Sequence, residues 1–207
     1  MTETPEPEYL VPRELGARVV IAEPDAAWAE QYATEEAMIR AALGAVLRRI
    51  EHAGSTSVPG LAAKPVVDIL LTVEDPADEA AYVQPLQAAG YTFHLREPHW
   101  HEHRLFKKGT PHFSPDRPED QPRVNLHVFP DECGEVRRML VFRDWLRSDA
   151  ADRRRYEEVK RALAMQEWRV VQDYADAKSE VVAEIMERAL QASNGEGSPA
   201  PTRTTSG

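Results

Sequence analysis

The sequence predicts an α+β fold in which a small mixed β-sheet is followed by a C-terminal helical segment. Short apolar runs alternate with helical patterns in the first two thirds of the chain. From residue 134 onward, apolar residues recur only at helical spacing. The chain has 207 residues and 42% hydrophobic content, which is enough for one well-buried core. We therefore expect one folded domain over residues 14–191.

Strands and helices are mixed in the first half of this domain. In chain order we expect a strand at 18–22, a helix at 26–43, strands at 45–52 and 66–73, and a helix at 77–89. Asp25 can cap the first helix, because its carboxylate accepts hydrogen bonds from free N–H groups of the first turn. Gly90 ends the second helix, because glycine readily adopts the left-handed conformation at a helix C-terminus.

The second half begins with strands and ends with helices. We expect strands at 91–95, 101–108 and 123–129, a loop with four prolines at 110–122, and helices at 134–147, 150–164 and 168–191. Residues 1–13 resemble a flexible leader, and residues 192–207 a disordered tail without apolar residues to bury.

Composition limits the classes of function. The net charge of −10 argues against a general nucleic-acid binder, whose affinity comes largely from Lys and Arg contacts to phosphates. A single cysteine, Cys133, excludes an intramolecular disulfide and fits a reducing compartment. The chain shows neither a signal-peptide pattern nor the run of about 18 apolar residues that a membrane span needs. We expect a cytoplasmic protein.

The most informative motif is a small-residue turn between two apolar runs. Gly54, Ser55, Thr56 and Ser57 form this turn, and Asp68 lies in the apolar run that follows. Backbone amides in such a turn can approach phosphate oxygens closely. A carboxylate inside an apolar strand needs a partner, and a divalent metal ion is one. The alternative is a purely structural role, in which the turn is only glycine-rich and Asp68 accepts hydrogen bonds from nearby amides.

This segment resembles the signature of the GrpB family. The matched positions are Glu51, His52, Gly54, Ser55, Thr56, Ser57, Val58, Pro59, Gly60, Leu61, Lys64, Pro65, Asp68 and Ile69. Weaker similarity extends over about residues 16–190. The resemblance implies a nucleotidyltransferase-like core, transfer of a nucleotidyl group from a nucleoside triphosphate to a small acceptor, and Mg²⁺ as the expected cofactor. A related domain is fused to some dephospho-CoA kinases, which suggests a protein partner.

The resemblance also implies roles for individual residues. Asp68 and His127 would be the catalytic and metal-binding pair, with His127 as metal ligand or proton acceptor. The turn and a set of further side chains would bind phosphate or ligand: Lys64, Arg104, Lys108, Arg143, Tyr174 and Lys178. In one respect the chain departs from active nucleotidyltransferases, which usually place two acids as Asp-x-Asp on the strand after the turn. Here Asp68 stands alone, so a binding module without turnover is the alternative.

Other chemistry competes with this interpretation. His99, His101 and His103 alternate, so a strand would place all three on one face, where they could hold zinc. A hydrolase triad of Ser55, His52 and Asp68 is conceivable, although the Gly-x-Ser-x-Gly motif is absent. His127 could also be a core histidine whose polar atoms are satisfied internally.

Overall fold

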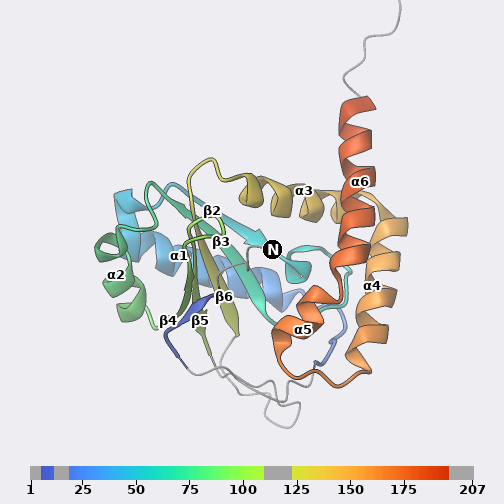
Figure 1. Cartoon of the computed structure of the whole chain (residues 1–207), viewed down its shortest axis with the longest axis horizontal. Helices are drawn as coiled ribbons and strands as arrows, with labels where there is room; N and C mark the ends of the chain where they lie inside the picture. The colour runs from blue at the N-terminus through green and yellow to red at the C-terminus, as the bar shows by residue number, and fades with distance from the viewer. Residues whose placement is uncertain (1–5, 12–18, 110–122, 196–207) are drawn as a thin grey trace, which may run out of the picture.

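The computed structural model describes residues 6–11, 19–109 and 123–195. These residues form a six-stranded sheet with helices on both faces (Figure 1). The expected loop at 110–122 and most of the expected tail lie outside the described residues. In the described ranges, no helix is long and apolar enough to cross a membrane.

The sheet is mixed, as the sequence predicts. Its strands are β1 (Glu8–Tyr9), β2 (Arg49–Ala53), β3 (Val67–Val73), β4 (Thr92–Glu97), β5 (His103–Lys108) and β6 (Val124–Pro130). They lie in the order β1-β4-β5-β6-β3-β2, with β3 and β6 parallel and all other neighbours antiparallel. The α+β prediction is therefore confirmed.

One face of the sheet carries the main core. Ile69, Leu126 and Phe106 lie on this face and are fully buried beneath α1 (Ala27–Leu43) and α2 (Val83–Ala88). We call it the α1 face. Since side chains alternate along a strand, the residues between them point to the opposite side.

The opposite side, which we call the α3 face, carries Asp68. Leu70 and Phe129 pack there against α3 (Gly134–Ser148). Asp68 precedes Leu70 by two residues, and Asn125 and His127 alternate with Phe129, so the same face carries all three.

Helices follow the sheet, again as predicted. α3 and α4 (Ala150–Ala164) match their expected bounds closely. The expected helix at 168–191 is instead two helices, α5 (Val171–Asp176) and α6 (Ser179–Gly195). Lys178 therefore lies in the short connection between them rather than mid-helix. Figure 1 shows α4, α5 and α6 grouped at one side of the sheet.

Several other boundaries differ from expectation. The strand expected at 18–22 is reduced to one bridge between Ala22 and Ala63. The strand expected from 45 begins at Arg49, because a short 3₁₀ turn, Gly44–Val46, follows α1. The helix expected at 77–89 is a 3₁₀ turn, Glu79–Ala81, followed by the short α2.

In addition, part of the expected leader forms the edge strand β1, which pairs with β4. The strand expected from 101 begins at His103, because His101 and Glu102 have left-handed φ angles of 54° and 51°.

Candidate functional site

Asp68 is the centre of the polar group on the α3 face. Its Oδ1 accepts a hydrogen bond of 2.9 Å from Asn125 Nδ2, since the two residues are partners in the parallel β3–β6 pair. His127 Nε2 lies 3.7 Å from the same oxygen. Burial acts to raise the pKa of Asp68, but His127, Asn125 and the Lys64 charge outweigh it, so this pKa lies below its usual value. Asp68 is therefore a carboxylate at neutral pH.

Gly54 leaves the space that Asp68 occupies. A Cβ on this glycine would lie only 2.2 Å from Asp68 Oδ2, and the backbone has φ +65° and ψ −172°. This region of φ and ψ is almost exclusive to glycine. The turn and the carboxylate are thus packed directly against each other.

The turn itself is a 3₁₀ helix, Ser55–Ser57, whose two buried side chains donate to nearby backbone carbonyls. Ser57 Oγ donates to Gly54 O at 2.6 Å, and Thr56 Oγ1 donates to Val66 O at 3.3 Å. His52 Nε2 lies 3.1 Å from Thr56 Oγ1. The hydrolase triad is therefore not assembled, since His52 contacts Thr56 rather than Ser55.

Two arginines of α3 hold this turn in place. Arg147 donates to Ser57 O from Nε at 3.1 Å and from Nη2 at 2.9 Å. Arg143 Nη1 donates to Glu51 Oε2 and His52 O, each at 2.9 Å. Arg143 lies beside the turn, as the sequence suggests. Its guanidinium, however, donates to protein acceptors and connects α3 to β2.

A group of cationic side chains lies beside Asp68 and is centred on Lys64. The pKa of Lys64 is lowered to about 8, mainly by burial and also by the positive charges of Arg123, Lys178 and Lys107, while Asp68 acts in the opposite direction. Lys107 is the sheet partner of Asn125 and lies on the α3 face. Sequence reasoning missed Lys107, although its alternation with His103 was available as a signal.

Two lysines of the C-terminal part interact with each other: Lys178, in the connection between α5 and α6, and Lys160 on α4. Lys178 Nζ lies 4.7 Å from the ring centroid of the buried Tyr174. Lys160 is 2% exposed and donates to Ala62 O at 2.5 Å, and burial together with the Lys178 charge lowers its pKa to about 7. Lys160 was not among the expected site residues, although it matches the family pattern.

Arg104 and Lys108, by contrast, are not at this site. Both lie on the α1 face, because their positions in β5 have the opposite parity to Lys107. Arg104 Nε donates to Glu79 at 2.9 Å, and Lys108 Nζ donates to Glu35 at 3.0 Å. The expectation that these two residues bind phosphate beside Asp68 is not met.

The three alternating histidines do not converge either. His103 is buried in β5, whereas His99 and His101 are exposed in the preceding turn. Within residues 6–11, 19–109 and 123–195, no group of three His, Cys, Asp or Glu side chains could hold a metal ion. The zinc alternative has no support here.

Asp68 alone could not hold a magnesium ion, so such an ion would have to arrive with phosphate. Mg²⁺ is usually bound by one or two carboxylates together with water and substrate phosphates. Asp68 supplies one carboxylate oxygen, Oδ2, that faces Gly54. An ion held by the protein alone would need more oxygen ligands than this.

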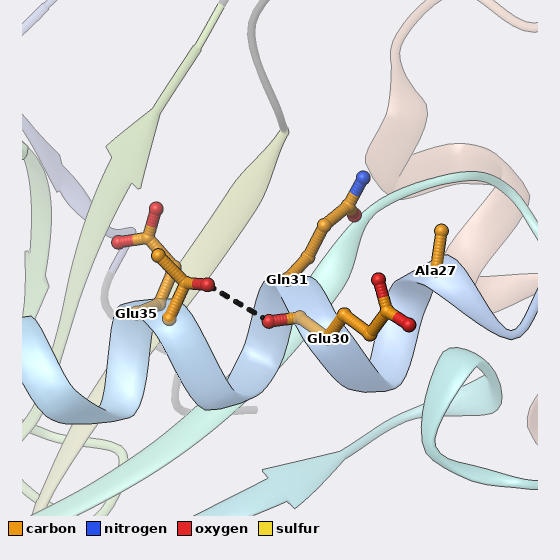
Figure 2. Close-up of a pocket in the computed structure, with 5 residues that line it drawn as sticks. Ala27, Glu30, Gln31 and Glu35 are labelled. Carbon is orange, nitrogen blue, oxygen red and sulfur yellow. Dashed lines mark hydrogen bonds between the residues drawn. The ribbon is translucent and has the colours of Figure 1, made fainter.

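Two of the hollows on the described part of the chain can be compared as ligand sites. One of about 480 Å³ lies between the C-terminal helices and is lined by Arg138, Tyr156, Ala175, Lys178, Ser179, Val182, Ala183 and Met186. The other, of about 260 Å³, lies along α1 and is lined by Ala27, Glu30, Gln31, Thr34 and Glu35 (Figure 2). Thr34 Oγ1 donates to Glu30 O there at 3.0 Å. Its two carboxylates disfavour an anionic ligand, whereas Lys178 in the lining of the first hollow favours one.

Comparisons with known proteins agree on one family. The family model described as GrpB protein matches residues 18–188. A UPF0157 protein of Halalkalibacterium halodurans is 51% identical over 173 residues, which cover 84% of this chain and 83% of that protein. A dephospho-CoA kinase of Mycolicibacterium paratuberculosis is 34% identical over 167 residues, covering 70% of this chain and 40% of the kinase. The crystal structure of GrpB from Enterococcus faecalis matches with a TM-score of 0.67 and 27% identity, covering 84% of this chain and 98% of that one.

Proposed function

Because the chain belongs to the GrpB protein family, we propose that it binds a nucleoside triphosphate or another small phosphorylated ligand beside Asp68. One observation carries this proposal. In a chain of net charge −10, the Lys64 ammonium interacts with the Asp68 carboxylate and also with the positive charges of three further residues, Arg123, Lys178 and Lys107. Repulsion from these charges adds to the effect of burial on the Lys64 pKa, and an anionic ligand would relieve that repulsion.

Individual residues then have distinct parts in binding. Lys64 and Lys178 would neutralise phosphate charge, while Tyr174 supports Lys178 through its ring. The backbone of residues 54–57 would approach the phosphate oxygens. Asp68 would hold Mg²⁺, and when bound this ion would polarise the phosphoryl group. Lys178 also lines the larger hollow, which offers room for a non-phosphate part of the ligand.

The reaction that fits this ligand is transfer of a nucleotidyl group to a small acceptor, as in nucleotidyltransferases. His127 would accept the proton of the attacking hydroxyl, because its Nε2 lies beside Asp68. Imidazole is a poor ligand for Mg²⁺, so we favour this role over metal binding. The similarity to a dephospho-CoA kinase supports a nucleotide-related function at a coarser level.

A binding module without turnover is the second candidate. Asp68 is one acid where two-metal chemistry needs several hard oxygen ligands. The dephospho-CoA kinase supports this candidate as well. The similarity covers only 40% of that kinase, as expected if a module of this type is joined to a separate kinase part. Such a module would bind the phosphorylated ligand at the same residues and contact a partner protein.

Calorimetry with ATP, GTP and inorganic triphosphate, each with and without magnesium, tests binding. Lys178→Gln should weaken it about tenfold, because a charge-assisted contact of about 1.5 kcal/mol is lost. Arg155→Gln, which removes an exposed charge on α4, is the matched control and should bind normally. Wild-type protein that binds none of the three ligands would refute the proposal. Pyrophosphate release in the presence of candidate acceptors separates the enzyme from the module.

A further inference from the structure

Three side chains on adjacent strands form a hydrogen-bonded chain that ends beside Asp68. Glu97 on β4 is the register partner of His103 on β5, and its Oε2 lies 2.7 Å from His103 Nδ1. His103 Nε2 lies 3.0 Å from Nδ1 of His127 on β6. The other ring nitrogen of His127, Nε2, is the atom 3.7 Å from Asp68 Oδ1. The chain thus connects a carboxylate outside the proposed site to the carboxylate within it.

The His103 ring is held firmly in this chain. Its side chain is 4% exposed. Phe129 stacks on it with a centroid distance of 4.6 Å and an interplanar angle of 28°, and Trp100 meets it edge-on at 5.1 Å. These contacts leave the imidazole little freedom to rotate away from its two hydrogen-bond partners.

Donor and acceptor rules assign the protons along the chain. A carboxylate only accepts, so His103 Nδ1 donates to Glu97. Burial lowers the pKa of His103 to about 4, which keeps the ring neutral at pH 7 with that single proton. His103 Nε2 is then an acceptor, and His127 Nδ1 must be the donor across the 3.0 Å contact.

This assignment determines the state of the nitrogen next to Asp68. When the His127 ring is doubly protonated, its Nε2–H favours the Asp68 carboxylate. When the ring is neutral and Nδ1 carries the proton, Nε2 has a free lone pair. Asp68 Oδ1 opposite is also an acceptor, and it already accepts from Asn125. Two acceptors therefore face each other across 3.7 Å, and a group that donates a proton to either of them would relieve their repulsion.

We propose that Glu97 and His103 are positioning residues that fix His127 in the Nδ1–H tautomer, so that Nε2 is presented as a proton acceptor beside Asp68. A carboxylate that orients a histidine in one tautomer prepares the other ring nitrogen for proton transfer in the same way. The inference rests on the proposed function for the identity of the donor, which would be a hydroxyl of the ligand or acceptor. The tautomer itself is expected in the ligand-free protein and does not depend on the proposed function.

The test is ¹⁵N NMR of the histidine side chains in the ligand-free full chain, with His127 assigned by the loss of its signals in His127→Gln. In its neutral form, the His127 ring should show a protonated Nδ1 and an unprotonated Nε2. His103→Leu removes the acceptor, so the proton should then exchange between both nitrogens and give intermediate shifts. His94→Leu removes a half-buried histidine of β4 outside the chain and should leave His127 unchanged.

A wild-type His127 that carries its proton on Nε2 would overturn the inference, even if His103→Leu failed to fold. Unchanged His127 shifts in a folded His103→Leu would overturn it too. Nucleotide affinity of the wild type is measured separately by calorimetry. Absence of nucleotide binding in the wild type would refute the proposed function and leave the tautomer result standing, so the two failures are distinguishable.

Discussion

Replacing Gly54 by alanine should disrupt the site through Asp68. The φ and ψ angles of +65° and −172° lie in a region that costs a non-glycine residue about 1–3 kcal/mol. The new Cβ would also lie 2.2 Å from Asp68 Oδ2, so the carboxylate must move and weaken its bond from Asn125, at about 1.5–3 kcal/mol. We expect a total loss of about 3–5 kcal/mol, or roughly 6–20 °C in Tm.

Gly60→Ala is the matched control for this prediction. Gly60 has a similar φ of +75°, but a Cβ there would meet no atom within 4 Å. Its substitution should cost only the backbone strain of about 1–2 kcal/mol and leave ligand affinity intact. Thermal melts and calorimetry of both variants provide the comparison. Equal losses of stability with equal nucleotide affinity would show that the Gly54–Asp68 contact does not organise the site.

Other substitutions test the parts around this contact. In the wild type, the free energy of unfolding should rise with pH between about 7 and 10.5, because Lys160 binds a proton there in the unfolded chain but not when buried. Lys160→Met should flatten this rise. Urea denaturation at pH 7.5 and 9 measures it, and the slope should be up to about 1.4 kcal/mol per pH unit steeper in the wild type than in the variant. Arg143→Gln should cost about 1.5–3 kcal/mol by releasing β2 from α3, whereas Arg155→Gln should stay within about 0.5 kcal/mol. Acid should destabilise the chain between pH 6.5 and 4, because folded His103 stays neutral while the unfolded residue is protonated, and His103→Leu should reduce that slope.

The sequence predicted the elements whose patterns are strong. β3 and β6 stand out as apolar runs, and α3 and α4 as helical repeats. The break between α5 and α6 could not be predicted, because apolar residues continue across it, with Ala175 before and Val182 after, and neither glycine nor proline marks it. β1 has only two residues and depends on pairing with β4, which no local pattern reveals.

At the site, sequence could place Asp68 beside the turn but not decide which cations face it. Lys107 and Lys108 are adjacent, and the start of β5 after the left-handed His101 and Glu102 sets which of them lies on the α3 face. A shift of one residue exchanges the faces. The contact between Glu97 and His103 also depends on the pairing of β4 with β5, which places the two residues opposite each other. Lys160 meets Ala62 only through tertiary packing, so its burial has no sequence signal.

Asp68→Asn gives the most direct measurement of the central claim, that a phosphorylated ligand binds with magnesium beside Asp68. The substitution keeps the size of the side chain and removes the charge that a hard cation requires. Because Asn125, His127 and Lys64 all favour the carboxylate, the variant should lose about 1–3 kcal/mol without ligand.

The measurement is the Tm of both proteins with and without nucleoside triphosphate and magnesium. At a ligand concentration one hundred times Kd, the wild type should gain about 2.7 kcal/mol, and magnesium should increase that gain. Asp68→Asn should show no magnesium-dependent gain. A destabilised Asp68→Asn whose Tm responds to nucleotide and magnesium as the wild type does would contradict the account and leave Asp68 a purely structural acceptor.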